Sequence, residues 1–217
     1  MKEPTLRRGR AVAWLPLVMT LLWGAGATQV EAQRVHRHSS SVEGYFIADF
    51  LGEYRLRVDG ERRASGDLDL DTTFGGGLRV GMTSGVFAMG LMAEFRGYGN
   101  ARYEDRDFAF DLAPYLGFRI PLIESRGNKV RLRGTFPLGF TVLRPAESAY
   151  GDSRYVGFNA GALGGMEVVF GPFGFFIDVG LRYHRVYANE DLGPLGDVKA
   201  NLSWTQLSLN AGMHYEF

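Results

Sequence analysis

The sequence ends in Asn210-Ala211-Gly212-Met213-His214-Tyr215-Glu216-Phe217, and this stretch decides the fold. Read in steps of two from Phe217 back to Leu207, every second side chain is apolar. The residues between them, from Glu216 back to Gln206, are polar or tiny. This alternation has the period of a β-strand and lasts for about twelve residues, which is longer than an ordinary globular strand. A strand of that length with one apolar face is typical of the lipid-facing wall of a membrane β-barrel.

The N-terminus has the three parts of a secretory signal peptide. Basic residues come first, an apolar run over 11–23 follows, and small residues then form two A-x-A-like sites, at 25–27 and 30–32. Cleavage is expected at the end of either site. Pro16 interrupts the apolar run, which falls short of the ~20 residues that a membrane-spanning helix needs, so a permanent anchor is disfavoured. We therefore predict a signal peptide over residues 1–32.

Composition narrows the class of protein further. The 217 residues include 30 glycines and no cysteine, so disulfides, thiolate metal sites and cysteine nucleophiles are excluded. Basic and acidic residues number 24 each, and removal of residues 1–32 would leave 20 basic and 22 acidic residues, a net charge of −2. This balance gives no electrostatic case for a nucleic-acid partner. No apolar stretch is long enough for a transmembrane helix, and an exported chain without one can still span a bilayer as a closed barrel.

Residues 33–43 are predicted to form a flexible N-terminal tether, because they are polar and basic and have no periodicity. Within them His36 and His38 flank Arg37, and an H-x-H pair can bind a metal. No third ligand lies near this pair in the sequence, so a solvated tail is favoured and no metal site or cofactor is predicted.

Eight alternating runs follow in residues 44–217, which are predicted to form the barrel domain. Each run has about ten or more residues, the length that a tilted transmembrane strand requires. Pro114 and Pro137 fall inside the fourth and fifth runs, where we expect a local bulge or bend because proline lacks a ladder donor. The runs lie at about 45–57, 67–82, 87–98, 108–120, 130–142, 156–170, 175–184 and 206–217.

The predicted connections differ in length. Tight turns follow the second and sixth runs, a somewhat longer segment from Pro121 to Lys129 follows the fourth, and longer polar segments follow the others. Outer-membrane barrels have short periplasmic turns and long external loops. We therefore predict an all-β fold, an eight-stranded antiparallel up-and-down transmembrane β-barrel with both termini on the periplasmic side. The longer segments lie at 58–66, 99–107, 144–154 and 187–199.

The polar face of the runs must fill the lumen if the apolar face meets lipid. The interior of an eight-stranded barrel is just wide enough for side chains. Acids and bases occur on this face in similar number, which indicates mutual pairing, since an unpaired charge in a tight interior is costly. The interior glycines are expected to make room for large side chains such as Tyr115. The predicted interior charge network consists of Asp49, Glu53, Arg55, Asp71, Arg79, Glu94, Arg96, Asp111, Arg119, Arg131, Arg133, Glu167, Asp178 and Arg182.

Two patterns could carry chemistry instead. His184 near Asp178 and Arg182 could form an acid–base site, but the charges spread over most strands, which favours a structural plug. Gly75-Gly76-Gly77 lies mid-strand and lacks the Gly-Lys-Ser/Thr of a phosphate-binding loop. His214 is expected to line the lumen. We therefore predict no catalytic residue and no enzyme activity.

These features together resemble the small outer-membrane β-barrel family, the OmpA/OmpX-like group. The resemblance covers residues 44–217 and rests on the eight runs, the order of turns and loops, and the ending. Asn210, Gly212, Tyr215 and Phe217 look like the terminal signal that the barrel-assembly machinery reads. The resemblance implies an outer-membrane location and contact with membrane lipid and lipopolysaccharide.

The resemblance also implies a range of functions. A structural or surface-interaction role in the envelope is favoured, with an extracellular partner bound through the loops. A narrow pore for small solutes is the first alternative. A lipid A-modifying enzyme is the second, although the deacylase type needs a His-x-Ser pair, and neither His184 nor His214 begins one. A soluble lipocalin-like barrel, with its apolar face turned inward, is the alternative fold.

Overall fold

The structure is a computed structural model, and it describes residues 38–59, 64–70, 72–100, 103–125, 127–144, 154–191 and 197–217. These residues form nine β-strands, and no helix among them is long and apolar enough to cross a membrane. The strands are β1 (His38–Asp59), β2 (Ala64–Leu70), β3 (Thr73–Ser84), β4 (Phe87–Asn100), β5 (Tyr103–Ser125), β6 (Asn128–Arg144), β7 (Tyr155–Phe170), β8 (Phe173–Asp191) and β9 (Asp197–Glu216).

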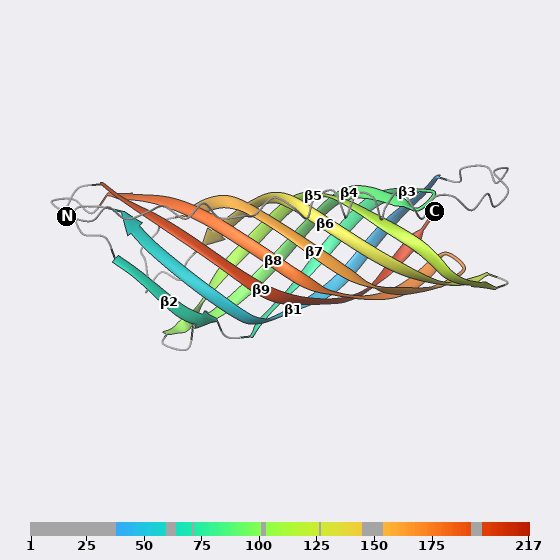
Figure 1. The fold of residues 1–217 in the computed structure, drawn as a ribbon, viewed down its shortest axis with the longest axis horizontal. Helices are drawn as coiled ribbons and strands as arrows, with labels where there is room; N and C mark the ends of the chain where they lie inside the picture. The colour runs from blue at the N-terminus through green and yellow to red at the C-terminus, as the bar shows by residue number, and fades with distance from the viewer. Residues whose placement is uncertain are drawn as a thin grey trace, which may run out of the picture. The chain divides into compact units, whose positions relative to one another are not determined.

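The strands form one antiparallel sheet that closes on itself (Figure 1). The hydrogen-bonded order is β1-β3-β4-β5-β6-β7-β8-β9, and β9 pairs again with β1. Because β2 and β3 both pair with β1, they are two parts of one barrel strand, and the described residues form eight barrel strands. At the C-terminus, Ser40 N–H donates to the Phe217 carbonyl at 3.0 Å and Phe217 N–H donates to the Ser40 carbonyl at 2.9 Å. The predicted eight-stranded barrel is confirmed.

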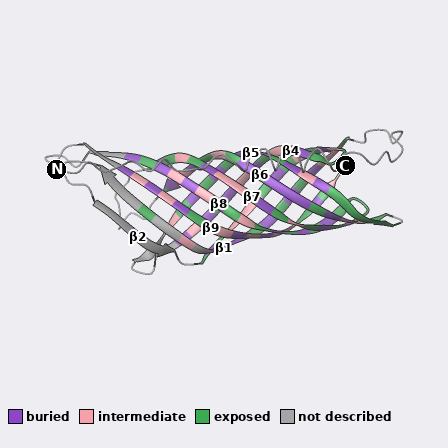
Figure 2. Ribbon diagram, in the orientation of Figure 1, coloured by how far each residue is buried: buried purple, intermediate pink, exposed green. Residues whose placement is uncertain are grey.

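Side chains alternate between the interior and the exterior along each strand, as the banding in Figure 2 shows. On β9, Phe217 and Met213 are 69% and 60% exposed, whereas His214 and Asn210 are 2% and 0% exposed. The apolar face therefore points outward, as the terminal alternation predicts. The soluble alternative, with the apolar face inside the barrel, is wrong.

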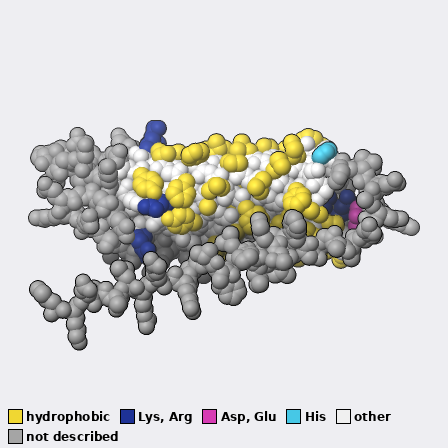
Figure 3. Space-filling view, turned by 45° about the horizontal axis from the view of Figure 1, so that its top comes forward, with side chains coloured by type: hydrophobic (Ala, Val, Ile, Leu, Met, Phe, Trp, Pro, Cys, Tyr) yellow, Lys and Arg dark blue, Asp and Glu magenta, His cyan; other side chains and the backbone are white. Residues whose placement is uncertain are grey.

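The exterior carries a belt of large apolar side chains, which Figure 3 shows on one face of the barrel. Phe87, Phe140 and Leu116 are 71%, 70% and 65% exposed, and similar residues occur on every barrel strand. Soluble monomers rarely expose an apolar patch larger than a few hundred Å². A closed barrel satisfies all its backbone hydrogen bonds internally, so this surface is suited to the hydrocarbon of a bilayer.

Strand β1 begins earlier than the sequence indicates. Residues 38–43 were predicted to belong to the tether of 33–43, but they pair with β3 from His38 and with β9 from Ser41. Three consecutive serines interrupt the hydrophobic alternation there, so the pattern of apolar residues does not reveal the strand. The predicted signal peptide of residues 1–32 and the tether residues 33–37 lie outside the described residues.

Strands β8 and β9 also extend beyond their apolar runs, at the end of the barrel away from the two chain termini of the sheet. β8 continues to Asp191 and β9 begins at Asp197, although a loop was predicted for 187–199. Apolar alternation marks only the part of a strand that faces lipid, whereas backbone pairing continues through polar residues. The connection predicted for 121–129 is a two-residue turn, because β5 continues to Ser125 and β6 begins at Asn128.

Three two-residue turns join β3 to β4, β5 to β6 and β7 to β8. Each contains a glycine with positive φ, Gly85 at 62°, Gly127 at 92° and Gly171 at 60°, a conformation that glycine adopts at little cost. All three turns lie at the end of the barrel where β1 begins and β9 ends, which we call the terminal mouth. At the opposite end, four residues separate β1 from β2, ten separate β6 from β7 and five separate β8 from β9. Only two residues separate β4 from β5, so the longer segment predicted for 99–107 is wrong.

The prolines do not cause a bulge, which is one of the two distortions predicted at their positions. The register of β4 with β5 is unchanged at Pro114, and that of β5 with β6 is the same on both sides of Pro137. A proline removes one hydrogen-bond donor, but it adds no residue to a strand. The register shifts lie elsewhere, between Phe50 and Glu53, Gly99 and Asn100, and Pro121 and Ile123.

Interior glycines make room for large rings from neighbouring strands, as predicted. Gly81 on β3 and Gly90 on β4 are directly opposite each other, and the ring of Tyr115 lies against both. A methyl group at Gly90 would lie 2.7 Å from the Gly81 Cα atom and 2.9 Å from Cε1 of Tyr115. A side chain at either position would therefore displace the backbone or the Tyr115 ring.

We expect Gly90→Ala to lower the free energy of unfolding by about 1–3 kcal/mol, the usual cost of overpacking. Gly164→Ala is the matched control, because Gly164 lies in the middle of β7 on the exterior and no described atom is within 4 Å of the added methyl group. The control should be stabilised by about 0.5–1 kcal/mol, because glycine weakens a strand interior. Urea titration of the folded gel band measures both, and equal effects would contradict the close packing described around Gly90.

Candidate functional site

The lumen holds a set of charged side chains that we call the interior charge network. Each of the eight barrel strands contributes at least one member. Most members make more than one ion pair, and the pairs are arranged in two layers along the barrel. The network comprises Glu43, Asp49, Arg79, Glu94, Arg96, Asp111, Arg119, Arg131, Arg133, Glu167, Asp178, Arg182, His184 and Glu216.

The lower layer lies toward the terminal mouth and has Glu43 at its centre. Arg133 Nη2 donates to Glu43 at 2.8 Å, and Arg79 Nη1 donates to the same carboxylate at 3.3 Å. Arg119 Nη2 donates to its other oxygen. Asp178 lies 3.0 Å from both Arg79 and Arg133. Strands β1 and β6 are four places apart around the barrel, so the contact between Glu43 and Arg133 crosses the whole lumen.

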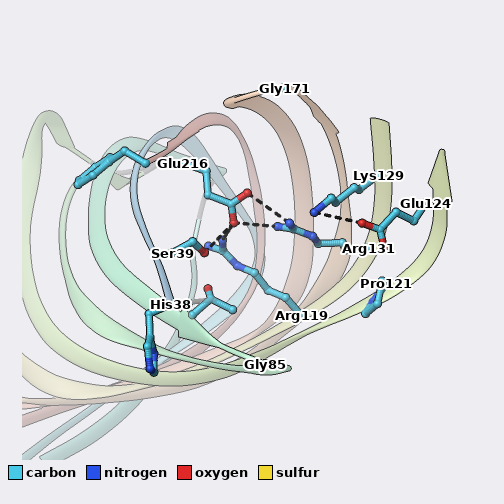
Figure 4. Close-up of a pocket in the computed structure, with 12 residues that line it drawn as sticks. His38, Ser39, Gly85, Arg119, Pro121, Glu124, Lys129, Arg131, Gly171 and Glu216 are labelled. Carbon is cyan, nitrogen blue, oxygen red and sulfur yellow. Dashed lines mark hydrogen bonds and ion pairs between the residues drawn. The ribbon is translucent and has the colours of Figure 1, made fainter. Parts of the chain in front are cut away.

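A charged recess of about 450 Å³ lies at the terminal mouth, as Figure 4 shows. Arg131 Nη1 lies 2.9 Å from Glu167 and 3.2 Å from Glu216, and Ser39 Oγ donates to Glu216 at 3.0 Å. Behind them lies Arg119, whose side chain is 4% exposed. The recess is therefore open at its outer end and closed at its inner end by paired charges.

The upper layer is centred on Arg96, which is fully buried. Its Nε donates to Asp49 at 2.9 Å, its Nη2 donates to Glu94 at 2.8 Å and its Nη1 donates to Asp111. Arg182 Nη2 also donates to Glu94. Strands β4 and β8 lie on opposite sides of the barrel, so the pair between Glu94 and Arg182 is a second contact across the lumen.

His184 belongs to this upper layer and does not pair with Asp178, so the alternative of an acid–base site formed by these two residues does not hold. His184 Nε2 lies 3.0 Å from Asp111, while Asp178 contacts arginines of the lower layer. Thr141 Oγ1 donates to the other oxygen of Asp111 at 2.5 Å. Trp204 stacks on the His184 ring with centroids 4.7 Å apart, and both rings are buried. This imidazole is a fixed part of the packing.

Apolar layers alternate with the charged layers inside the barrel. The sequence did not lead to a prediction of these apolar layers. Tyr45 joins the layers, because its hydroxyl donates to Glu94 at 2.8 Å and its ring lies 4.3 Å from the Arg79 guanidinium carbon. Ile47 and Phe176 pack beside it at 0% and 2% exposure. A second cluster lies beyond the upper layer, toward the opposite end. It consists of Tyr98, Ala109, Leu143, Tyr155, Val186, Ala188, Ala200, Leu202 and Trp204.

Most of the predicted interior charges lie together in this network. They are Asp49, Arg79, Glu94, Arg96, Asp111, Arg119, Arg131, Arg133, Glu167, Asp178 and Arg182, all at 9% exposure or less. The sequence reasoning did not include Glu43, which was predicted to lie in the tether. Its spacing of two from Tyr45 and six from Asp49 could have placed it on the inner face.

Three predicted members do not belong to the described network. Asp71 and the Glu53 side chain lie outside the described part of the chain. Arg55 is exposed, so its predicted interior position is wrong. The shift between Phe50 and Glu53 gives β1 one extra residue relative to β9 and reverses the faces beyond it. Arg55 consequently pairs with Ser203 on the outer face.

The proposed assembly-signal residues occupy both faces of β9. Asn210 is buried in the lumen, and Gly212 is opposite Tyr45, whose Cβ would lie 2.5 Å from a methyl group at Gly212. Tyr215 and Phe217 are exposed on the exterior, with ring centroids 6.1 Å apart. Within the described residues, no group of three or more His, Cys, Asp or Glu side chains could hold a metal ion.

Comparison with solved structures identifies the fold. The outer membrane protein OprG from Pseudomonas aeruginosa matches with a TM-score of 0.54 and 11% identity, over 86% of this chain and 99% of OprG. The outer membrane protein AlkL, solved in DMPC bilayers, matches with a TM-score of 0.57 and 12% identity, over 88% of this chain and 95% of AlkL. No protein-family model and no curated protein matches the sequence. The fold is that of small outer-membrane β-barrels, and the apolar exterior agrees with it.

Proposed function

We propose that this outer-membrane β-barrel is a closed envelope protein with a structural or surface-interaction role. The observation that carries the proposal is the pair of ion contacts that cross the lumen, Glu43 with Arg133 and Glu94 with Arg182. These four side chains are 3% exposed or less. They close the barrel at two heights.

The closed state resists opening because each buried charge depends on its ion-pair partner. Removing one member of a buried pair leaves an uncompensated charge, which costs about 3–5 kcal/mol. A solute that passes through the lumen would have to separate such pairs in both layers. Tyr45 and Phe176 fill the space between the layers. This arrangement supports a plug over a narrow pore.

The surface role rests on the connections between strands at one end of the barrel. Loops on a rigid scaffold commonly carry binding residues, and the longer connections lie at the end opposite the terminal mouth. Lipopolysaccharide and an extracellular partner are the proposed contacts at that end. At the other end, Tyr215 and Phe217 are the proposed contacts of the barrel-assembly machinery.

A non-enzymatic role agrees with the positions of two of the three histidines that the structure describes, the third being the exposed His38. His184 and His214 are 0% and 2% exposed, and both face the lumen. A lipid-modifying site would need its acid–base groups to reach the acyl chains or the headgroup of a membrane lipid. Unchanged lipid A mass spectra after expression of the chain would agree with the proposal, and a mass change would overturn its non-enzymatic part.

We expect residues 33–217, refolded into planar lipid bilayers, to give no discrete conductance steps. Liposomes that contain the protein should swell in small sugars no faster than protein-free liposomes, because the paired charges occupy the lumen. The gel shift of the unheated protein confirms that the barrel has inserted in the same sample. Discrete steps or rapid swelling with inserted protein would favour the narrow pore instead.

A further inference from the structure

An apolar groove of about 420 Å³ lies on the lipid-facing exterior near the end opposite the terminal mouth. Its walls include Phe95 on β4, Phe108 and Phe110 on β5, and Val142 on β6. The rings of Phe95 and Phe108 are stacked with centroids 5.4 Å apart and 19° between their planes. Gly97 is directly opposite Phe108 and leaves room for that ring. The groove is therefore formed by aromatic side chains on β4 and β5 and by a valine on the adjacent strand β6.

Two arginines complete the lining of this groove. Arg144 is the last residue of β6, Arg154 directly precedes β7, and both are exposed. Figure 3 shows basic residues at this edge of the apolar belt. A guanidinium group binds phosphate through parallel hydrogen bonds, and such charge-assisted bonds are stronger than neutral ones. The site thus combines an apolar groove with cationic donors at one end.

The position of the groove selects one class of ligand. It faces hydrocarbon, so its occupant there is an acyl chain, and the arginines lie where the apolar belt ends and the headgroup region begins. A zwitterionic headgroup would place its own cation near the two arginines, whereas a phosphomonoester brings only negative charge. Charge complementarity therefore favours an anionic lipid with exposed phosphate groups.

We infer that this groove binds one phosphorylated lipid of the outer leaflet, with an acyl chain against Phe95 and Phe108 and a phosphate between Arg144 and Arg154. Lipid A has this chemistry. The inference rests on the proposed function in one respect, because the end opposite the terminal mouth must face the outer leaflet. It is independent of whether the lumen conducts.

Native mass spectrometry of residues 33–217 released from detergent tests the site, with diphosphoryl lipid A as the probe. The unchanged protein should retain one lipid A molecule. The double variant Arg144→Ala/Arg154→Ala should bind at least about tenfold more weakly, because hydrogen bonds to a charged group are lost. Lipid A that has been dephosphorylated should bind the unchanged protein with a similar loss.

Two further variants separate the groove from general surface charge. Arg185→Ala removes a basic residue at the same end that instead contacts Asn201 at 3.4 Å, and it should leave binding unchanged. Val142→Trp fills the groove while both arginines stay, and it should weaken binding. The gel shift of the unheated protein shows that each variant is folded, and Arg154→Ala replaces the double variant if that one does not fold.

Equal retention of lipid A by the arginine variants and the unchanged protein would overturn the inference. Equal binding of dephosphorylated lipid A would also overturn it. Neither result affects the proposal of a closed lumen, because that proposal is tested by conductance. Conversely, a conducting barrel that still distinguishes the two forms of lipid A would support the groove and contradict the closed lumen.

Discussion

Arg96→Met is expected to lower the free energy of unfolding by about 3–5 kcal/mol, the cost of removing one partner from a buried ion pair. Arg96 is fully buried and contacts Asp49, Glu94 and Asp111. Methionine keeps much of the side-chain length, so the change removes charge and hydrogen bonds more than volume. Among the ion pairs that the structure describes, Glu94 and Asp111 would then keep a single arginine partner, Arg182.

Urea unfolding in lipid vesicles, followed through Trp204 fluorescence, measures this effect. After removal of residues 1–32, Trp204 is the single remaining tryptophan. Its ring stacks on His184, which contacts Asp111, so the probe lies beside the altered cluster. The gel shift of the unheated protein gives a second measure that does not depend on the environment of Trp204.

Lys129→Met provides the matched control, because Lys129 also forms an ion pair, with Glu124 at 3.3 Å. These side chains are 37% and 52% exposed, and an exposed pair contributes only about 0–1 kcal/mol. A loss as large for Lys129→Met as for Arg96→Met would contradict the distinction between buried and exposed pairs.

A second substitution tests whether the stability lost in Arg96→Met comes from the unpaired Asp49 carboxylate. In Arg96→Met/Asp49→Asn, one of the unpaired acids is neutral and can still accept a hydrogen bond from Gln206, which donates to Asp49 at 2.8 Å in the unchanged protein. The double variant should therefore lose less stability than the sum of the two single variants. Strict additivity would show that Arg96 and Asp49 do not interact energetically.

The orientation of most interior charges could be predicted from the sequence because side chains alternate strictly along an uninterrupted strand. Asp111, Glu167 and Asp178 all follow this rule, and all are 1% exposed or less. The rule fails for Arg55, because a register shift adds a residue to β1 and reverses its faces. No local composition marks that shift.

The partners within the network could not be predicted from the sequence. Alternation tells which face a residue occupies, but not its height in the barrel or its neighbour across the lumen. Asp178 and His184 are six residues apart on one strand, so they lie in different layers, and each contacts residues far away in the sequence. The stagger of the strands decides these contacts, and it depends on the register of every strand pair.

The apolar part of the interior had no clear signal for a related reason. Met92 and Phe176 lie on the face that carries charges, and both are buried in the lumen at 1% and 2% exposure. An apolar residue on a polar face resembles an irregularity in the pattern. Only the closed structure shows that it fills a layer between charged groups.

Val179→Arg should lower the free energy of unfolding in lipid by about 2–4 kcal/mol, the cost of an arginine on the lipid face at the bilayer midplane. Val179 is 49% exposed and lies on the outer face of β8, midway between Phe173 and Arg185. The substitution leaves the interior charge network unchanged. Its effect therefore depends on the solvent that surrounds the exterior.

Tyr187→Arg is the control on the same face of β8, beyond Arg185 and near the end opposite the terminal mouth. Near the membrane interface an arginine costs only about 0–1 kcal/mol. Urea titration of the gel shift compares both variants with the unchanged protein in the same vesicles. A cost that rises toward Val179 places the middle of the apolar belt in hydrocarbon, whereas equal costs at both positions would mean that water surrounds the barrel.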